Sequence, residues 1–134
     1  MTRGPAVRIE RQVDWIDTDA AGHYHHSSVI RWAEAAEAEL LRRVGAPDLT
    51  PTVPRVRYEV DYLDRLYFRD TALVDLWVDK VGTSSLRYGF EVTRAGHGPA
   101  ARGAMTCVLV DPGTGASAPW PADLARRLGG APGG

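Results

Sequence analysis

Hydrophobic and polar residues alternate over five stretches of the chain, which is the pattern of β-strands with one buried face. In the first stretch, Val7, Ile9, Val13 and Trp15 alternate with mostly polar residues. The other four stretches follow one another from residue 55 onward, separated by turns rich in Gly, Asp and Pro. Their alternating positions are 56, 58, 60 and 62; 72, 74, 76 and 78; 86, 88, 90 and 92; and 104, 106, 108 and 110. The sequence therefore predicts five strands, with the last four joined as antiparallel hairpins.

A different period, typical of a helix, runs from about Ser28 to Val44. Apolar side chains recur there every three or four residues, so that one face is apolar and charges lie mostly on the other. Ser27 or Ser28 can cap the first turn through its hydroxyl. The middle of the apolar face is alanine, which lets the helix backbone approach the structure that it packs on. A second, short helix is predicted from Pro121 to about Leu128.

The predicted order is one strand, one long helix, four strands and a short helix, which is an α+β arrangement. A sheet of this length can curl around one helix and bury its apolar stripe. The last strand carries Met105, Cys107 and Leu109 on its second face, and the second of the four later strands carries Leu73 and Trp77. Such a face is too apolar for solvent, so a partner subunit is expected to cover part of it.

The length of 134 residues is that of one domain, with a core at about 7–128 and a flexible tail at 129–134. The net charge of −1 gives no reason to expect nucleic acid or an anionic membrane as a partner. Cys107 is the only cysteine, so no internal disulfide can form, and a cytoplasmic location is expected. The N-terminus lacks the apolar run of a secretory signal, and no stretch has the length of a transmembrane helix.

The stretch from Asp17 to His26, between the first strand and the long helix, carries most of the candidate chemistry. It holds two carboxylates, three histidines and Gly22, which can adopt a backbone conformation that a side chain would resist. A carboxylate before a helix can activate water or attack a carbonyl, and amides of the first turn can stabilise an oxyanion. Asp19 could equally cap the turn, and on the chemistry alone the two interpretations are about even. The histidines lack a second ligand cluster, so no metal is expected.

The run from Asp17 to Glu34 resembles the signature of the 4-hydroxybenzoyl-CoA thioesterase family of hotdog-fold acyl-CoA thioesterases. That signature reads approximately D-x-D-x-x-G-H-x-x-H and precedes a helix with an aromatic residue and a glutamate. Weaker likenesses follow in order at 60–63, 82–86 and 120–121, so the resemblance spans about 7–128. It implies a long central helix wrapped by a five-stranded antiparallel sheet. It also implies a homodimer that pairs edge strands, with a homotetramer as a further assembly.

The resemblance implies roles for particular residues. Asp19 would be the catalytic carboxylate, as nucleophile or as general base, and the His26 amide would polarise the thioester carbonyl. The His26 side chain matches a histidine that is functional in some relatives, whereas Asp17 is expected to hold the turn. The expected substrate-binding residues are Gly22, His23, His25, Tyr62, Ser85 and Arg87.

Most of these residues have a structural alternative. His23 and His25 could support the loop, while Tyr62 and Ser85 could be ordinary strand and turn positions. Arg87, like Arg57 and Arg102, could meet the phosphates of CoA or belong to a solvated strand face.

Three functions remain open from the sequence. The first is a hydrolase that cleaves acyl-CoA or acyl-carrier-protein thioesters without a cofactor. The second is a hotdog dehydratase or hydratase, which the motif spacing fits less well, and the third is a non-catalytic acyl-thioester binding protein. Trp15 and the run 27–29 differ from the residues of many relatives beside the expected acyl pocket, so the acyl group stays unassigned.

Overall fold

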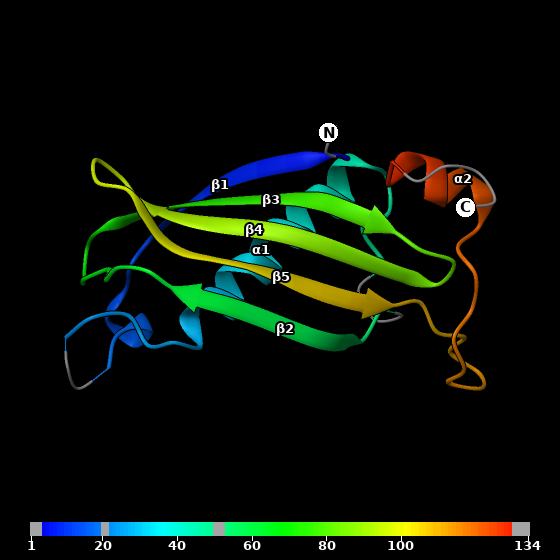
Figure 1. Cartoon of the computed structure of the whole chain (residues 1–134), viewed down its shortest axis with the longest axis horizontal. Helices are drawn as coiled ribbons and strands as arrows, with labels where there is room; N and C mark the ends of the chain where they lie inside the picture. Colours follow the sequence, from blue (N-terminus) through cyan, green and yellow to red (C-terminus); the bar gives the residue numbers. More distant parts are fainter. Residues whose placement is uncertain (1–3, 20–21, 50–52, 130–134) are drawn as a thin grey trace.

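The computed structural model describes residues 4–19, 22–49 and 53–129, and in them a five-stranded antiparallel sheet packs against one long helix (Figure 1). The order of elements that the sequence predicts is confirmed. Residues 130–134 of the predicted tail lie outside the described part. The strands are β1 (Ala6–Gln12), β2 (Arg55–Tyr62), β3 (Thr71–Val81), β4 (Ser85–Arg94) and β5 (Pro99–Val108), and the helices are α1 (Ser28–Arg43) and α2 (Ala122–Arg127).

The sheet has the order β1-β3-β4-β5-β2, so β2 and β3 do not form the hairpin that their closeness in sequence suggested. Instead, β2 pairs with β5 at one edge, and β1 pairs with β3 at the other. The link at 63–70 crosses the end of the sheet, where Leu66 is fully buried and its carbonyl accepts a hydrogen bond from the Tyr24 amide (2.7 Å). Backbone bonds also join Arg69 and Asp70 to Val13. The loop is therefore a packed part of the structure and brings residues after β2 close to those before α1.

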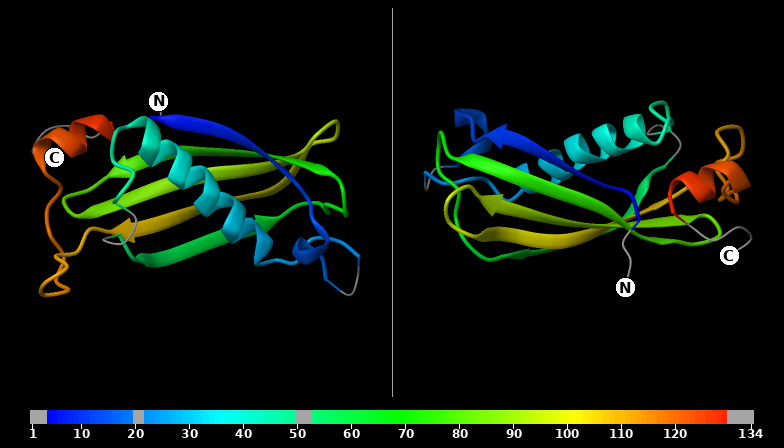
Figure 2. Two further views of the ribbon diagram at one scale, coloured as in Figure 1. Left: turned by 180° about the vertical axis from the view of Figure 1, so that it is seen from behind. Right: turned by 90° about the horizontal axis from the view of Figure 1, so that it is seen from above.

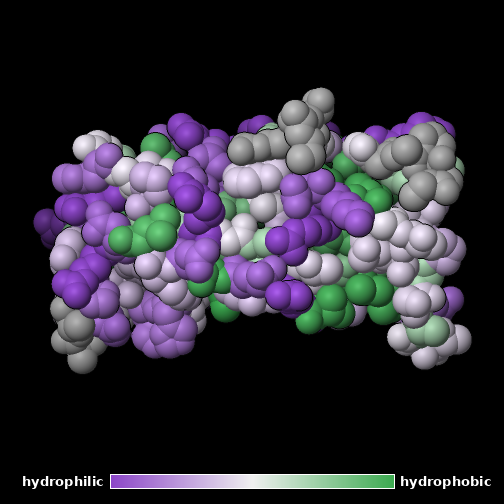
Figure 3. Space-filling view, viewed as in Figure 1, coloured by the Kyte–Doolittle hydropathy of each residue, from purple (hydrophilic) through white to green (hydrophobic). Residues whose placement is uncertain are grey.

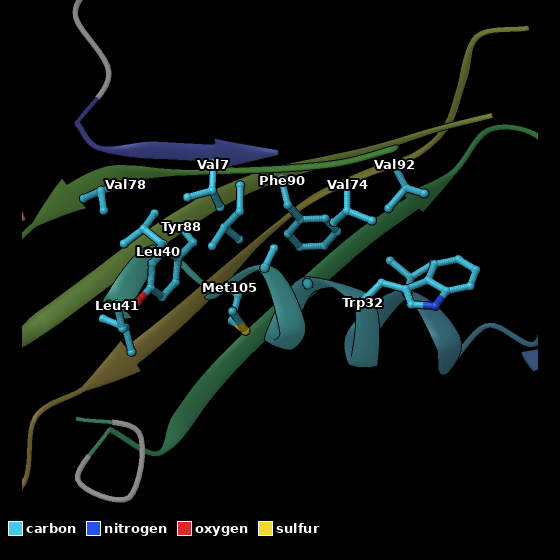
Figure 4. Packing of buried hydrophobic residues seen from close by; sticks show 14 of the residues in the cluster. Val7, Trp32, Leu40, Leu41, Val74, Val78, Tyr88, Phe90, Val92 and Met105 are labelled. Atoms are coloured by element: carbon cyan, nitrogen blue, oxygen red, sulfur yellow. The ribbon is translucent and has the colours of Figure 1, made fainter. Parts of the chain in front are cut away.

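Helix α1 crosses one face of the sheet, as the views from behind and from above show (Figure 2). Its buried face includes Val29, Ala33, Ala36 and Leu40, close to the stripe that the sequence predicts. The facing strands contribute every second residue, and full burial of a Val, Leu or Phe side chain stabilises the fold by about 1.5–3 kcal/mol. Figure 4 shows this packing, with residues of β1, β3, β4 and β5 directed toward the helix. None of the helices in the described ranges is long and apolar enough to cross a membrane.

The prediction for the two faces of β5 is wrong. Met105 and Cys107 are fully buried on the side of α1, because they pair with Tyr88 and Leu86 of the inward-facing row of β4. Several small residues in β5 leave both of its faces similar in hydrophobicity, so alternation alone could not distinguish them. Met105 and Cys107 therefore no longer support a partner subunit on the outer face.

The outer face of the sheet is mostly polar. Ion pairs such as Arg8–Asp75 (2.8 Å) and Arg102–Glu91 (2.9 Å) link neighbouring strands across it. Figure 3 views this face, where hydrophilic side chains cover a large part and hydrophobic ones gather toward the end at which α2 lies. Trp77 lies over Gly89, and a side chain at that glycine would collide with the indole.

Two edge segments also depart from simple alternation. Strand β1 ends at Gln12, and Trp15, which is 75% exposed, begins a short 3-10 helix (Trp15–Asp17). In β2, a register shift between Arg55 and Arg57 leaves Val56 exposed. Arg55 then contacts residues of α1 through its guanidinium.

A buried ion pair joins α1 to β2. The Glu37 side chain is 1% exposed, and both of its oxygens contact the Arg55 guanidinium, whose Nη1 also lies 3.3 Å from the Cys107 sulfur. Burial raises the pKa of Glu37, although Arg55 opposes this effect. Burial also raises the pKa of the Cys107 thiol to about 11. The edge strand is thus attached to the helix by a polar contact inside an otherwise apolar core.

Candidate active site

Asp17 fixes the loop that leads into α1. Its carboxylate accepts a hydrogen bond from the Asp14 amide (2.9 Å) and pairs with Arg31 of α1 (2.9 Å). Its carbonyl accepts bonds from the His25 amide (2.6 Å) and from the Ser28 hydroxyl (2.9 Å). The structural role expected for Asp17 is confirmed, because these bonds hold the 3-10 helix against the start of α1.

A tight turn presents Asp19. The Asp19 amide donates to the His23 carbonyl and the Gly22 amide donates to the Asp19 carbonyl, both at 3.0 Å. Gly22 has φ +86°, which confirms the conformational role predicted for it. Asp19 itself is exposed. These two hydrogen bonds therefore hold the backbone of an aspartate that is exposed.

The start of α1 is not capped as the sequence predicts. Ser27 occupies the N-cap position without a capping bond from its hydroxyl, and the Ser28 hydroxyl donates to Asp17 instead. The His25 ring lies beside Ser27, and its Nδ1 accepts a hydrogen bond from the Ser27 amide (3.2 Å). Within the described residues, no group accepts a hydrogen bond from the His26 amide. This amide can therefore donate to a ligand at the positive end of the helix dipole.

A hollow of about 400 Å³ lies between this loop and the end of β2. It is lined by Asp19, His23, Tyr24, His26, Tyr62, Leu63, Asp64 and Arg65. The Tyr62 hydroxyl donates to the His26 carbonyl (2.8 Å). Strand β2 therefore helps to hold His26, whose amide can donate to a ligand. The Tyr24 hydroxyl donates to the carbonyls of Asp64 (3.0 Å) and Ala100 (3.3 Å). Burial, with Tyr62 and Asp64 nearby, raises the pKa of Tyr24 to about 12, so at neutral pH it is a hydrogen-bond donor.

The hollow brings together four of the residues that the sequence singled out, Asp19, His23, His26 and Tyr62. Gly22 and His25 belong to the same loop but are not lining residues, and the centroid of the His25 ring lies 4.1 Å from that of His26, with the ring planes tilted by 34°.

Ser85 and Arg87 do not reach this hollow within one chain. Ser85 pairs with Val108 at the far end of β5, about 26 Å from Ala100 at the near end. Arg87 contacts Asp79 and Glu59, each at 3.2 Å.

Sequence reasoning missed four lining residues. Tyr24 lay inside the motif but was not assigned a role, although its hydroxyl has two acceptors. Leu63, Asp64 and Arg65 follow β2 and reach the loop only because that strand pairs with β5. Their recognition required the strand order, which no local pattern contains.

The described residues contain no group of three or more His, Cys, Asp or Glu side chains suited to holding a metal ion.

A single long helix packed across a curled five-stranded antiparallel sheet defines the hotdog fold. The thioesterase-like superfamily matches residues 13–128, and the chain belongs to that superfamily. A 1,4-dihydroxy-2-naphthoyl-CoA hydrolase of Prochlorococcus marinus (strain NATL2A) is 32% identical over 98 residues, which cover 62% of this chain. The chain spans 63% of the length of that relative.

Solved structures share the fold. A thioesterase from Thermus thermophilus, in complex with coenzyme A and Zn, is 29% identical, with a TM-score of 0.83. That match covers 96% of this chain and 94% of the other. A 1,4-dihydroxy-2-naphthoyl-CoA thioesterase from Synechocystis has the same TM-score at 21% identity, covering 92% and 95% of the two chains. At that identity, the likeness shows the fold alone.

Proposed function

We propose that this protein hydrolyses acyl-CoA thioesters to a carboxylic acid and free coenzyme A. The observation that carries the proposal is the hollow in which Asp19 and His26 meet at the start of α1, in a chain of the thioesterase-like superfamily. Thioester hydrolysis needs a group that attacks the carbonyl or activates water, and donors for the oxyanion that forms. The hollow offers a carboxylate for the first requirement and a helix-start amide for the second.

In this mechanism, the thioester carbonyl oxygen accepts a hydrogen bond from the His26 amide. Asp19 either removes a proton from the attacking water or attacks the carbonyl carbon itself, forming an anhydride that water then opens. In both routes the carbon–sulfur bond breaks, an oxygen of water enters the products, and the leaving thiolate takes up a proton. The helix dipole favours the negative charge that develops on the carbonyl oxygen.

We propose an aromatic acyl group as the substrate. Four rings, those of His23, Tyr24, His26 and Tyr62, line the hollow and offer stacking and edge contacts to a flat group. The motif resembles that of 4-hydroxybenzoyl-CoA thioesterases, and a relative is named for a dihydroxynaphthoyl thioester. Hydroxylated aromatic acyl-CoAs are therefore the first compounds to test, with acyl-carrier-protein thioesters as the alternative carrier.

We further propose that the protein works as a homodimer in the cytoplasm, with a homotetramer as the larger alternative. Large apolar residues are exposed in the single chain, including Trp15 (75%), Ile16 (83%) and Phe68 (43%). A second subunit that covers them would remove this surface from water. Ser85 and Arg87 would contribute to substrate binding only if such a partner brought them to the hollow.

Thiol release from a panel of acyl-CoAs tests the proposal, with Asp19→Asn beside the wild type. We expect Asp19→Asn to lower kcat by about 10²–10⁴-fold, whereas Asp48→Asn, in the exposed loop after α1, leaves it unchanged. Unchanged hydrolysis by Asp19→Asn would refute the site assignment. Addition of water to an enoyl-CoA without thiol release would favour a hydratase. A single turnover in heavy-oxygen water separates the two routes, because only the anhydride route places label in Asp19.

A further inference from the structure

The arginines that the sequence associated with CoA phosphates are already neutralised by carboxylates. Arg57 contacts Glu59 (3.4 Å), Arg102 contacts Glu91 (2.9 Å), and Arg87 contacts both Glu59 and Asp79. Each of these guanidiniums would have to give up an ion pair before it bound a phosphate. Within one chain, these arginines are therefore poor candidates for binding a phosphate of CoA.

Arg65 differs from these arginines in both position and pairing. It lines the hollow that contains Asp19, and its side chain forms no ion pair with any group in the described ranges. The other acidic and basic side chains among the lining residues are those of Asp19, Asp64 and two histidines. Among the lining residues, Arg65 is thus the one with a permanent positive charge.

The backbone at Arg65 is fixed, although its side chain is exposed. The Arg65 amide donates to the Asp64 carboxylate (2.7 Å), and the Tyr24 amide donates to the carbonyl of the buried Leu66 (2.7 Å). The Arg65 side chain is therefore exposed to solvent on a held segment that lines the hollow. The planar guanidinium presents parallel N–H donors, and on such a fixed backbone it suits an anion that carries two oxygens.

We propose that Arg65, in the segment after β2 that lines the hollow together with the loop of Asp19, binds an anionic oxygen group of the thioester substrate. This inference rests on the proposed function. The anion has two possible sources, a phosphate of coenzyme A or an acidic substituent on the acyl group, and both offer the same paired oxygens. Arg65 then offsets the repulsion that Asp19 and Asp64 exert on an anionic substrate.

The test compares Arg65→Gln with the wild type on four thioesters. These are benzoyl-CoA, benzoyl-N-acetylcysteamine (which has no phosphate) and the 4-carboxybenzoyl form of each. The matched control is Arg69→Gln, because the Arg69 guanidinium lies over the Phe68 ring (5.1 Å from its centroid) and Arg69 is not a lining residue. Loss of one charge-assisted contact should raise KM about tenfold, whereas Arg69→Gln should leave KM unchanged.

Two outcomes support the proposal. A higher KM for both CoA thioesters, with unchanged KM for both N-acetylcysteamine thioesters, identifies a CoA phosphate as the anion. A higher KM for both 4-carboxybenzoyl thioesters alone identifies the acidic acyl group. Unchanged KM for all four compounds overturns the proposal, as does an equal rise that includes the neutral, phosphate-free benzoyl-N-acetylcysteamine.

Calorimetry with free coenzyme A and with benzene-1,4-dicarboxylate provides a readout that does not depend on turnover. We expect Arg65→Gln to weaken the binding of one of these compounds about tenfold. If the wild type released no thiol from any thioester but Arg65→Gln still weakened this binding, the hydrolase proposal would fail while the Arg65 site stood. If the wild type and Arg65→Gln bound each compound with the same affinity, the Arg65 site itself would be refuted.

Discussion

Replacing Arg55 by Met would leave the Glu37 carboxylate buried without its counter-ion. The Glu37 side chain is 1% exposed and that of Arg55 is 23% exposed, so water can replace the guanidinium only in part. Removing one partner of a buried ion pair costs about 3–5 kcal/mol. Because the Arg55 side of the pair reaches solvent, we expect a loss at the lower end of that range, about 3 kcal/mol.

This loss converts into a measurable change in Tm. Unfolding entropies of about 2.1 cal/mol/K per residue amount to about 0.28 kcal/mol/K for a chain of this length, so Tm should fall by about 10 °C. The effect should depend on pH, because burial already raises the pKa of Glu37 and removal of Arg55 raises it further. The protonated acid tolerates burial. The loss is therefore largest above the pKa of Glu37 in the folded variant and shrinks as the pH falls through it.

Thermal unfolding followed by circular dichroism at pH 8 and pH 5 measures both effects. Arg42→Met is the matched control, because Arg42 pairs with Glu39 (2.6 Å) on the surface and its side chain is 65% exposed. The control should lose less than about 1 kcal/mol. The double variant Glu37→Gln with Arg55→Met should recover at least half of the loss, since no buried charge remains. If Arg55→Met lowered Tm no more than Arg42→Met, or by the same amount at both pH values, the reasoning would be wrong.

Further predictions concern close packing, the buried thiol and the hollow. A methyl group at Gly103 would overlap the Glu59 carbonyl oxygen, so Gly103→Ala should cost at least about 2 kcal/mol in urea unfolding; a neutral effect would contradict this contact. Cys107 has a pKa raised to about 11 by burial, so at pH 8 a thiol reagent should titrate no thiol in the native protein and one in denaturant. Reaction of the native protein at the rate of a free thiol would disprove this. Tyr62→Phe removes the hydrogen bond to the His26 carbonyl, and if the proposed function holds, thiol release should show kcat about tenfold lower with a smaller change in KM. A change in KM alone would instead assign Tyr62 to substrate binding.

Local sequence patterns were sufficient to predict the elements whose buried face is set by their own sequence. Helix α1 begins at Ser28 as predicted and ends within one residue of the predicted end, and the predicted inward rows of β3 and β4 are buried throughout. Long runs with a strong contrast between faces define these elements. The conformation of Gly22 could also be predicted, because it depends on the local backbone alone.

Features that depend on pairing between distant strands could not be predicted from alternation. The inward face of β5 follows from its register with β4, and the exposure of Val56 follows from a register shift against β5. Glu37 would ordinarily indicate a solvent-facing position on the helix. Its burial requires Arg55, which lies 18 residues away and contacts it only after that shift.

The candidate site also combines residues that local patterns predict with residues that depend on the strand order. Asp19 and His26 belong to one contiguous motif, so their proximity in space was visible in the sequence. Arg65 lies in the hollow because β2 is the outer neighbour of β5, which places the end of β2 beside the loop before α1. When two segments far apart in the sequence form a site, all of its side chains can be identified only after the strand order is known.

The strand order also bears on how the chain folds. The hairpins β3–β4 and β4–β5 join neighbours in sequence, whereas at the two edges Val7 pairs with Leu76 and Tyr58 pairs with Met105. Closing those long loops carries an entropic cost that the central hairpins avoid. We therefore expect the three central strands to form the folding nucleus and the edge strands to join after the rate-limiting step. In stopped-flow experiments, Val92→Ala in β4 should mainly slow folding, whereas Val7→Ala in β1 should mainly accelerate unfolding, and the opposite pattern would place the nucleus at an edge.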